Sequence, residues 1–197
     1  MSDGEGLDRI LWLAGRVPWS DRAGSGVRLD HPSARLQPEA IVRAMASVSR
    51  VMHGLDVSSC SFSASVDDLL ERATRRVDAG LTPRGSFAPP YQRYEPVDLL
   101  AMCVAVRPDD LEVASDLVVT HGSLIPANLS VDDGEVTAVT GGAGLGVGDR
   151  YRDLAVTAAA LAEVVGPGAV GPFFAEYGIE RPDPLKIDFF VLLSQFG

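Results

Sequence analysis

The sequence Val118-Val119-Thr120-His121-Gly122-Ser123-Leu124-Ile125-Pro126-Ala127-Asn128-Leu129-Ser130-Val131 predicts two apolar strands joined by a polar loop. The first strand covers 117–119 and runs into His-Gly, and Asn128 opens the second strand. The Asp132-Asp133-Gly134 turn then leads into a third strand over 135–139. A unit of this kind holds a few polar side chains at the mouth of a cleft on a rigid base.

The composition is that of a soluble globular protein. The chain has 197 residues, of which 46% are apolar and 22% are charged, enough for one domain with a sizeable core. Its formal net charge of -10 argues against nucleic acid and anionic membranes as partners. The charge favours a solvated acidic surface or cationic ligands.

The cysteines and the chain start indicate the cellular compartment. Cys60 and Cys103 lie far apart without a CxxC or Cys-His companion, which is typical of free, buried thiols in a reducing environment. No apolar run approaches the roughly 18–20 residues that span a bilayer. The acidic start over 1–5 lacks the basic region of a signal peptide. We therefore expect a cytoplasmic protein.

Apolar spacing, prolines and glycines predict a mainly helical chain around the strands. The predicted helices cover 7–15, 38–54, 66–79, 96–106, 149–165, 172–177 and 184–195. Ser65 is expected to cap the third of these helices, and Gly80 to end it. Loops are predicted over 16–36, 82–94 and 140–148, and the five glycines of the last indicate a close approach to another segment. The chain is expected to be a single domain, 1–197, with an N-terminal helix and irregular loop, 1–36, and a helical lobe, 37–197.

Several segments resemble the aminoglycoside phosphotransferases, small-molecule kinases of the protein-kinase-like fold. Their catalytic loop reads His-Gly-Asp, four residues, Asn, and His121, Gly122 and Asn128 fit it with the same spacing. Two further segments, 52–56 (Met-His-Gly-Leu-Asp) and 147–153 (Val-Gly-Asp-Arg-Tyr-Arg-Asp), are also similar to the family. The resemblance implies an α+β, mainly α-helical fold: a protein-kinase-like large (C-terminal) lobe with a small central β-hairpin. No N-terminal nucleotide-binding lobe is expected, because so few residues precede the first predicted helix.

The chain departs from the family at residues that carry phosphoryl transfer. Ser123 stands where the family has the aspartate that accepts the hydroxyl proton, and Gly141 stands at the position of its metal-binding aspartate. Phosphoryl transfer depends on positioning and charge neutralisation, so both changes remove groups that the chemistry needs. Lys186 is the only lysine, and its place near the C-terminus does not suit phosphate binding. We therefore expect no cofactor and no metal.

The function expected from these residues is that of a catalytically impaired family member, a pseudokinase, that binds a ligand or a protein partner. The alternative is an enzyme with a remodelled cleft: a residual ATP- or GTP-dependent small-molecule phosphotransferase, or an acid/base reaction that uses Ser123, His121 and Glu163. The implied catalytic candidates are Ser123 and His121, and the implied ligand-binding candidates are Asn128, Asp149, Arg150, Glu163 and Gln195.

Structural roles are the competing interpretation. Asn128 can anchor the loop, His121 can donate hydrogen bonds to its backbone, and Asp149 and Asp153 can cap the helix that follows, with Arg150 in an ion pair. The glycine-rich loop is either a degenerated metal loop or a weak phosphate site made of backbone amides. The implied partners are a small-molecule amine or another metabolite, and a second copy of the chain or a partner protein over an exposed lobe face. Neither nucleic acid nor a membrane is expected.

Overall fold

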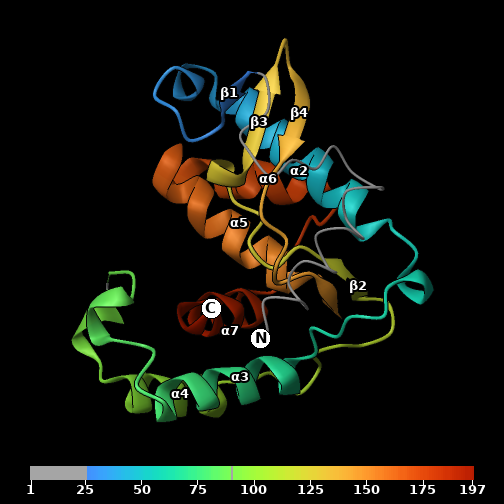
Figure 1. Cartoon of the computed structure of the whole chain (residues 1–197). Helices are drawn as coiled ribbons and strands as arrows, with labels where there is room; N and C mark the ends of the chain where they lie inside the picture. Colours follow the sequence, from blue (N-terminus) through green and yellow to red (C-terminus); the bar gives the residue numbers. More distant parts are fainter. Residues whose placement is uncertain (1–25, 90) are drawn as a thin grey trace.

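The computed structural model describes residues 26–89 and 91–197 (Figure 1). The helices in this part are α2 (Pro38–His53), α3 (Val66–Asp78), α4 (Pro96–Ala105), α5 (Tyr151–Val164), α6 (Val170–Tyr177) and α7 (Pro184–Leu193). The strands are β1 (Val27–Arg28), β2 (Leu117–Thr120), β3 (Leu129–Asp132), β4 (Glu135–Val139) and β5 (Gly146–Asp149). They form two sheets, one in the order β1-β3-β4 and one that pairs β2 with β5. The predicted α+β, mainly helical class is confirmed.

Within the described residues, the helix predictions from periodicity and caps are confirmed to within a few residues. Pro38 occupies the first turn of α2, and Gly54 follows its last residue. The Ser65 hydroxyl accepts a hydrogen bond from the Asp68 backbone N–H at 3.2 Å, as expected of a capping serine. Gly80 has a φ of 66° just beyond α3, a backbone conformation that suits glycine.

Two strands lie where loops were predicted. Val27–Arg28 pairs with β3, so the predicted central hairpin is part of a three-stranded sheet. Gly146–Asp149 pairs with β2, although its glycines predict an irregular loop. Both strands form by pairing with segments far away in the sequence, and such pairing leaves little local signal in so short a segment.

The predicted close approach at the glycine-rich segment is confirmed at β5. The backbone over 62–64 runs beside this strand, where the Ala64 N–H donates to the Val147 carbonyl at 2.8 Å and the Val147 N–H donates to the Phe62 carbonyl at 2.8 Å. A Cβ atom on Gly148 would lie 2.5 Å from the Ala64 carbonyl oxygen. Glycine is therefore required there by the neighbouring backbone rather than by a turn.

Replacing Gly148 with alanine is expected to lower the free energy of unfolding by about 2 kcal/mol, because the added methyl group meets backbone that cannot rotate away. Urea denaturation followed by circular dichroism measures the change. Gly168→Ala is the matched control, since a Cβ atom at Gly168 would meet nothing within 4 Å. Equal stability of the two variants would contradict the close packing of β5.

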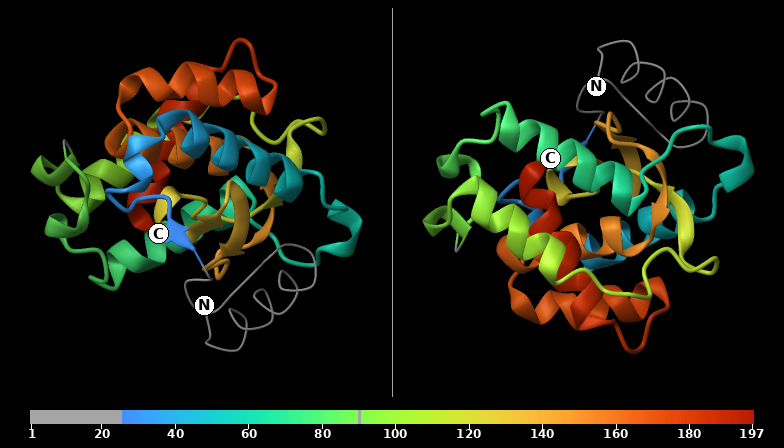
Figure 2. Two further views of the ribbon diagram at one scale, coloured as in Figure 1. Left: turned by 90° about the horizontal axis from the view of Figure 1, so that it is seen from above. Right: turned by 90° about the horizontal axis from the view of Figure 1, so that it is seen from below.

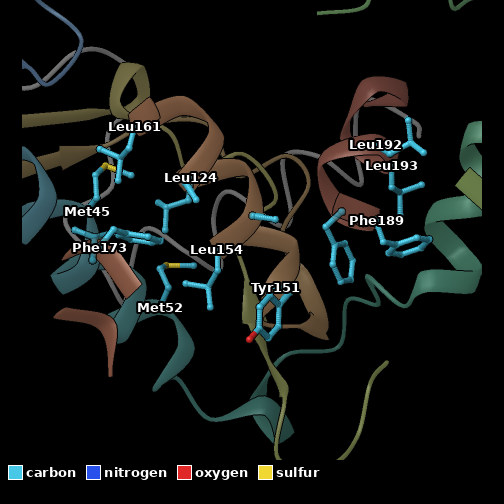
Figure 3. Close-up of a cluster of buried hydrophobic side chains, with 14 of the residues drawn as sticks. Met45, Met52, Leu124, Tyr151, Leu154, Leu161, Phe173, Phe189, Leu192 and Leu193 are labelled. Atoms are coloured by element: carbon cyan, nitrogen blue, oxygen red, sulfur yellow. The ribbon is translucent and has the colours of Figure 1, made fainter. Parts of the chain in front are cut away.

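Helix α5 runs through the middle of the molecule and packs against α2, α6 and α7 (Figures 1 and 2). Figure 3 shows how Met45 and Met52 of α2, Leu154 of α5 and Phe173 of α6 meet in the core. Leu124, from the loop after β2, is wholly buried in the same core. The core therefore fixes the loop that carries the polar residues of interest.

Some predictions lie outside the described residues. The helix over 7–15, the first part of the loop over 16–36 and the expected lack of a nucleotide-binding lobe concern residues before Gly26, so they stay predictions. In the described ranges, no helix has the length and apolar character needed to cross a bilayer. Cys60 and Cys103 are buried and form no disulfide, as predicted.

Candidate functional site

The loop after β2 brings three of the predicted residues together. His121 is fully buried, whereas Ser123 is exposed two residues later. Asn128 lies in a short 3-10 turn, and its Nδ2 donates a hydrogen bond to the Ser123 carbonyl oxygen at 2.8 Å. The same Nδ2 lies 3.3 Å from the Ser123 hydroxyl oxygen. The expected role of Asn128 as a loop anchor is therefore confirmed.

His121 is held in a neutral form by its surroundings. Burial lowers the pKa of its ring, and the charge of Asp153 opposes this effect only in part. The Ser123 backbone N–H lies 3.3 Å from Nδ1, which accepts the hydrogen bond, so the ring proton is on Nε2. The nearby Thr140 backbone also raises the ring pKa, but no described residue meets hydrogen-bond geometry with Nε2. Nδ1 accepts from the loop backbone, so the prediction that His121 donates to this backbone can apply only to Nε2 and stays a prediction there.

The Asp153 carboxylate holds the backbone of the loop after β2 in place. One carboxylate oxygen accepts a hydrogen bond from the His121 N–H at 2.6 Å, and the other accepts one from the Gly122 N–H at 2.7 Å. Burial would raise the pKa of this carboxyl, but His53, Arg152 and His121 lower it to about 2. The prediction that Asp153 caps the following helix is wrong: its side chain leaves α5 and bonds to the loop.

A histidine and a tyrosine complete this network, and neither role was predicted. His53, the last residue of α2, lies 3.4 Å through Nε2 from the Asp153 carboxylate. Its Nδ1 lies 2.8 Å from the hydroxyl of Tyr177, at the end of α6. The segment 52–56, which resembles the family, includes His53, but the resemblance does not predict that His53 contacts Asp153 or Tyr177. No sequence signal singles out Tyr177, because the contact depends on how α2 and α6 pack.

Gly141 lies beside His121 and Asn128. A Cβ atom at this glycine would lie 3.5 Å from His121 Cε1 and 3.7 Å from Asn128 Nδ2, so a side chain would fit without a clash. Mg²⁺ prefers carboxylate oxygens, and neither Gly141 nor Ser123 provides one. In the described part of the chain, no group of three or more His, Cys, Asp or Glu side chains is arranged to hold a metal. The residues present do not fit the magnesium–nucleotide complex that the family resemblance implies.

Asp149 and Arg150 have structural partners. The Asp149 carboxylate accepts hydrogen bonds from the backbone N–H groups of Glu112 and Tyr151, each at 2.9 Å. Burial raises the pKa of this carboxyl, and the two hydrogen bonds oppose the rise. Arg150 Nε lies 3.3 Å from an Asp116 carboxylate oxygen. The predicted cap and ion pair are confirmed, and a ligand-binding role for these two residues stays a prediction.

Lys186 is held in a buried ionic network. Its Nζ lies 3.1 Å from an Asp116 carboxylate oxygen and 3.0 Å from the Asp110 carbonyl oxygen. Burial would lower the pKa of the ammonium group, but Asp116, Asp149 and Asp110 raise it above its ordinary value. The ammonium group of the only lysine is therefore engaged by protein carboxylates and a backbone carbonyl.

Glu163 and Gln195 are not connected to the loop after β2. Glu163 is exposed on α5, and no hydrogen bond between described residues joins either side chain to Ser123 or Asn128. Gln195 lines a cavity of about 520 Å³ between the segment 81–88 and the end of α7. Its Oε1 accepts a hydrogen bond from the Ala88 N–H at 2.9 Å. The ligand-binding candidates therefore fall into separate places.

Comparisons with known proteins agree with the geometry. Residues 10–190 match the profile of the phosphotransferase enzyme family, APH. An aminoglycoside 3'-phosphotransferase from Streptomyces fradiae is 35% identical over 196 residues, which cover 96% of this chain and 69% of that protein. One from Niallia circulans is 25% identical over 96% of this chain and 77% of that protein. The crystal structure of an aminoglycoside-3'-phosphotransferase of type VIII matches 98% of this chain and 81% of its own, with a TM-score of 0.86 and 28% identity. The chain therefore belongs to the aminoglycoside phosphotransferase family of kinase-like proteins.

Proposed function

We propose that this family member does not transfer phosphate and instead binds a small molecule. The proposal rests on the chemistry of the loop after β2. Ser123 and Gly141 both lie beside the Asn128 amide, where phosphoryl transfer needs a proton acceptor and a metal ligand. A serine hydroxyl is neutral at pH 7, and glycine has no side chain, so neither residue supplies negative charge.

The proposal rests on one observation: the nearby carboxylates are already engaged in hydrogen bonds with the backbone. Asp153 and Asp149 each accept two hydrogen bonds from backbone N–H groups. Turning either carboxylate toward Ser123 would leave two backbone donors unpaired, at a cost of about 1–3 kcal/mol for each buried donor. Neither aspartate can therefore replace the missing groups without breaking the loop or the start of α5.

The geometry also disfavours Ser123 as an activated nucleophile. A general base must lie within hydrogen-bond reach of the proton that it removes. His121 Nδ1 accepts its hydrogen bond from the Ser123 backbone N–H, and Asn128 Nδ2, the atom near the Ser123 hydroxyl, is a donor. Neither side chain is placed to take the hydroxyl proton.

The purified protein is expected to transfer no phosphate from ATP or GTP to kanamycin, neomycin or streptomycin in the presence of Mg²⁺. The rate of nucleoside diphosphate formation should equal that of a mixture without protein, because no carboxylate accepts the proton or holds the metal. A coupled spectrophotometric assay measures this rate. Isothermal titration calorimetry should show no Mg²⁺-dependent binding of ATP tighter than about 1 mM.

A variant decides whether any residual turnover belongs to this loop. Ser123→Ala removes the hydroxyl group that replaces the family's aspartate, and Ser47→Ala is a control at an exposed serine on α2. Turnover by the wild type that Ser123→Ala abolishes and Ser47→Ala retains would overturn the proposal. Turnover that neither substitution alters would indicate a contaminating kinase, and a fresh preparation by a second purification route must then be inactive.

A further inference from the structure

We propose that helices α3 and α4, together called the arm, open away from the core as one unit, and that Glu112 holds them closed. Figure 1 shows the arm below α7, which it packs against, and α5 above α7. Two residues of α3 and three of α4 are buried, against eight of α5. Elements with few buried apolar contacts open at a lower free energy than the core of a protein. Opening of the arm is independent of whether the chain transfers phosphate.

Glu112 connects the arm to the core through its side chain and its backbone. Its Oε1 accepts a hydrogen bond from the Val66 backbone N–H at 2.9 Å, at the first residue of α3. The start of a helix leaves this N–H group without a partner inside the helix. The Glu112 backbone N–H donates to Asp149 Oδ2 at 2.9 Å. Because Asp149 also accepts a hydrogen bond from the Tyr151 N–H, Glu112 joins the start of α3 to the start of α5.

The closed arm carries two costs at this joint. Glu112 has a φ of 58°, and it is one of two residues other than glycine with a positive φ in the described ranges. This conformation brings a Cβ atom too close to a backbone carbonyl oxygen. Asp149 is 1% exposed, and burial raises the pKa of its carboxyl, although its two hydrogen bonds and Lys186 oppose the rise. Burial therefore disfavours the charged carboxylate that the joint contains at pH 7, and opening of the arm lets both costs relax.

The chain is fixed on both sides of the arm. Before α3, the backbone over 62–64 pairs with β5. After α4, the Asp110 carbonyl oxygen accepts a hydrogen bond from Lys186 Nζ of α7 at 3.0 Å. Within the arm, Arg107 Nη1 lies 2.6 Å from Asp67 Oδ1, which links the residues after α4 to the first turn of α3. The arm can therefore move as a unit between two fixed points.

Hydrogen exchange followed by mass spectrometry tests the inference on the full chain at pH 7. In the wild type, the amides of α3 and α4 should be at least about tenfold less protected than those of α5. Glu112→Ala should lower protection in the arm by about a further fivefold, because α3 loses the partner of its first N–H group. Protection in α5 should stay within about twofold. Glu112→Gln keeps an oxygen acceptor, so its arm should stay within about threefold of the wild type.

Glu112→Gly separates the backbone cost from the hydrogen bond. Both Glu112→Ala and Glu112→Gly lose the carboxylate, but glycine adopts a positive φ without strain. The arm should therefore be at least about threefold more protected in Glu112→Gly than in Glu112→Ala. Asp133→Ala is the matched control, since Asp133 is exposed and has a φ of 47° in the β3–β4 turn, far from the arm (Figure 1). It should change exchange in that hairpin and leave the arm unaltered.

Three results would overturn the inference. Equal protection of the arm and α5 in the wild type would mean that they open together, and this measurement needs no variant. Equal protection of the arm in Glu112→Ala and the wild type would show that Glu112 does not hold α3. An equal loss of protection in the arm and α5 of Glu112→Ala would indicate a loss of global stability in place of an opening arm. None of these results bears on phosphate transfer, so they are distinct from failure of the proposed function.

Discussion

Replacing Asp153 with asparagine is expected to lower the free energy of unfolding by about 3 kcal/mol. The carboxylate accepts two short hydrogen bonds from the His121 and Gly122 backbone N–H groups. An asparagine can accept only one of them, because its amide nitrogen would face the other N–H group. Hydrogen bonds to charged groups contribute roughly 1.5–3 kcal/mol each, and an unpaired buried donor adds its own cost. Urea denaturation at pH 7 measures the loss.

The pH dependence of this effect has a definite sign. The pKa of Asp153 is about 2 in the folded chain, below the ordinary value of 3.8. A carboxyl whose pKa falls on folding stabilises the protein above its unfolded pKa and loses this contribution as the pH falls toward the folded value. The free energy of unfolding of the wild type should therefore fall by about 2 kcal/mol between pH 4 and pH 2 because Asp153 becomes protonated. Asp153→Asn should lack this part of the pH dependence.

Asp188→Asn is the matched control for Asp153→Asn. Asp188 is exposed on α7, so the same chemical change should alter the free energy of unfolding by less than about 0.5 kcal/mol. Comparable stability of the two variants at pH 7 would show that Asp153 does not fix the loop. The same conclusion would follow if Asp153→Asn retained the wild-type loss of stability between pH 4 and pH 2.

The sequence predicts the elements whose signals are local. Helix α2 follows from apolar spacing, a proline in its first turn and a glycine after its end. The β3–β4 hairpin follows from two apolar segments around an Asp-Gly turn, where Asp133 and Gly134 both have positive φ. In the candidate site, the spacing of His121 and Asn128, which matches the family's catalytic loop, was enough to identify this loop in the sequence. These features depend on residues that are neighbours in sequence.

The features that the sequence does not predict depend on contacts between distant segments. Strand β1 has two residues, and only its pairing with β3 defines it. The glycines of β5 indicate freedom of the backbone, whereas the structure uses them to admit the segment over 62–64. The position of Asp153 at the start of α5 suggests a helix-capping residue. Because α5 packs against the loop after β2, its carboxylate instead bonds to the backbone of that loop. The contact between His53 and Tyr177 arises because α2 packs against α6.

Introducing two carboxylates is expected to create a divalent-metal site at Asn128. In the double variant Ser123→Asp, Gly141→Asp, both new side chains start beside the same amide. The Ser123 hydroxyl oxygen lies 3.3 Å from Asn128 Nδ2, and a Cβ atom at Gly141 would lie 3.7 Å from it. Two carboxylates and an amide oxygen, after rotation of the Asn128 amide, form an oxygen set that suits Mg²⁺ or Mn²⁺. Calorimetry or Mn²⁺ electron paramagnetic resonance should show binding at least about tenfold tighter than in the wild type.

The double variant Ser123→Asn, Gly141→Asn separates charge from shape. Gly141 has a φ of 86°, so any side chain there carries backbone strain, but aspartate and asparagine tolerate this conformation better than most residues. The two double variants should therefore be destabilised to a similar extent without metal. Only the aspartate variant should gain stability when Mn²⁺ is added, because a metal that binds the folded state alone shifts the unfolding equilibrium toward it. If both variants responded equally to Mn²⁺, the lack of carboxylates would not explain why the wild-type loop holds no metal. The physical basis of the proposed loss of phosphate transfer would then be wrong.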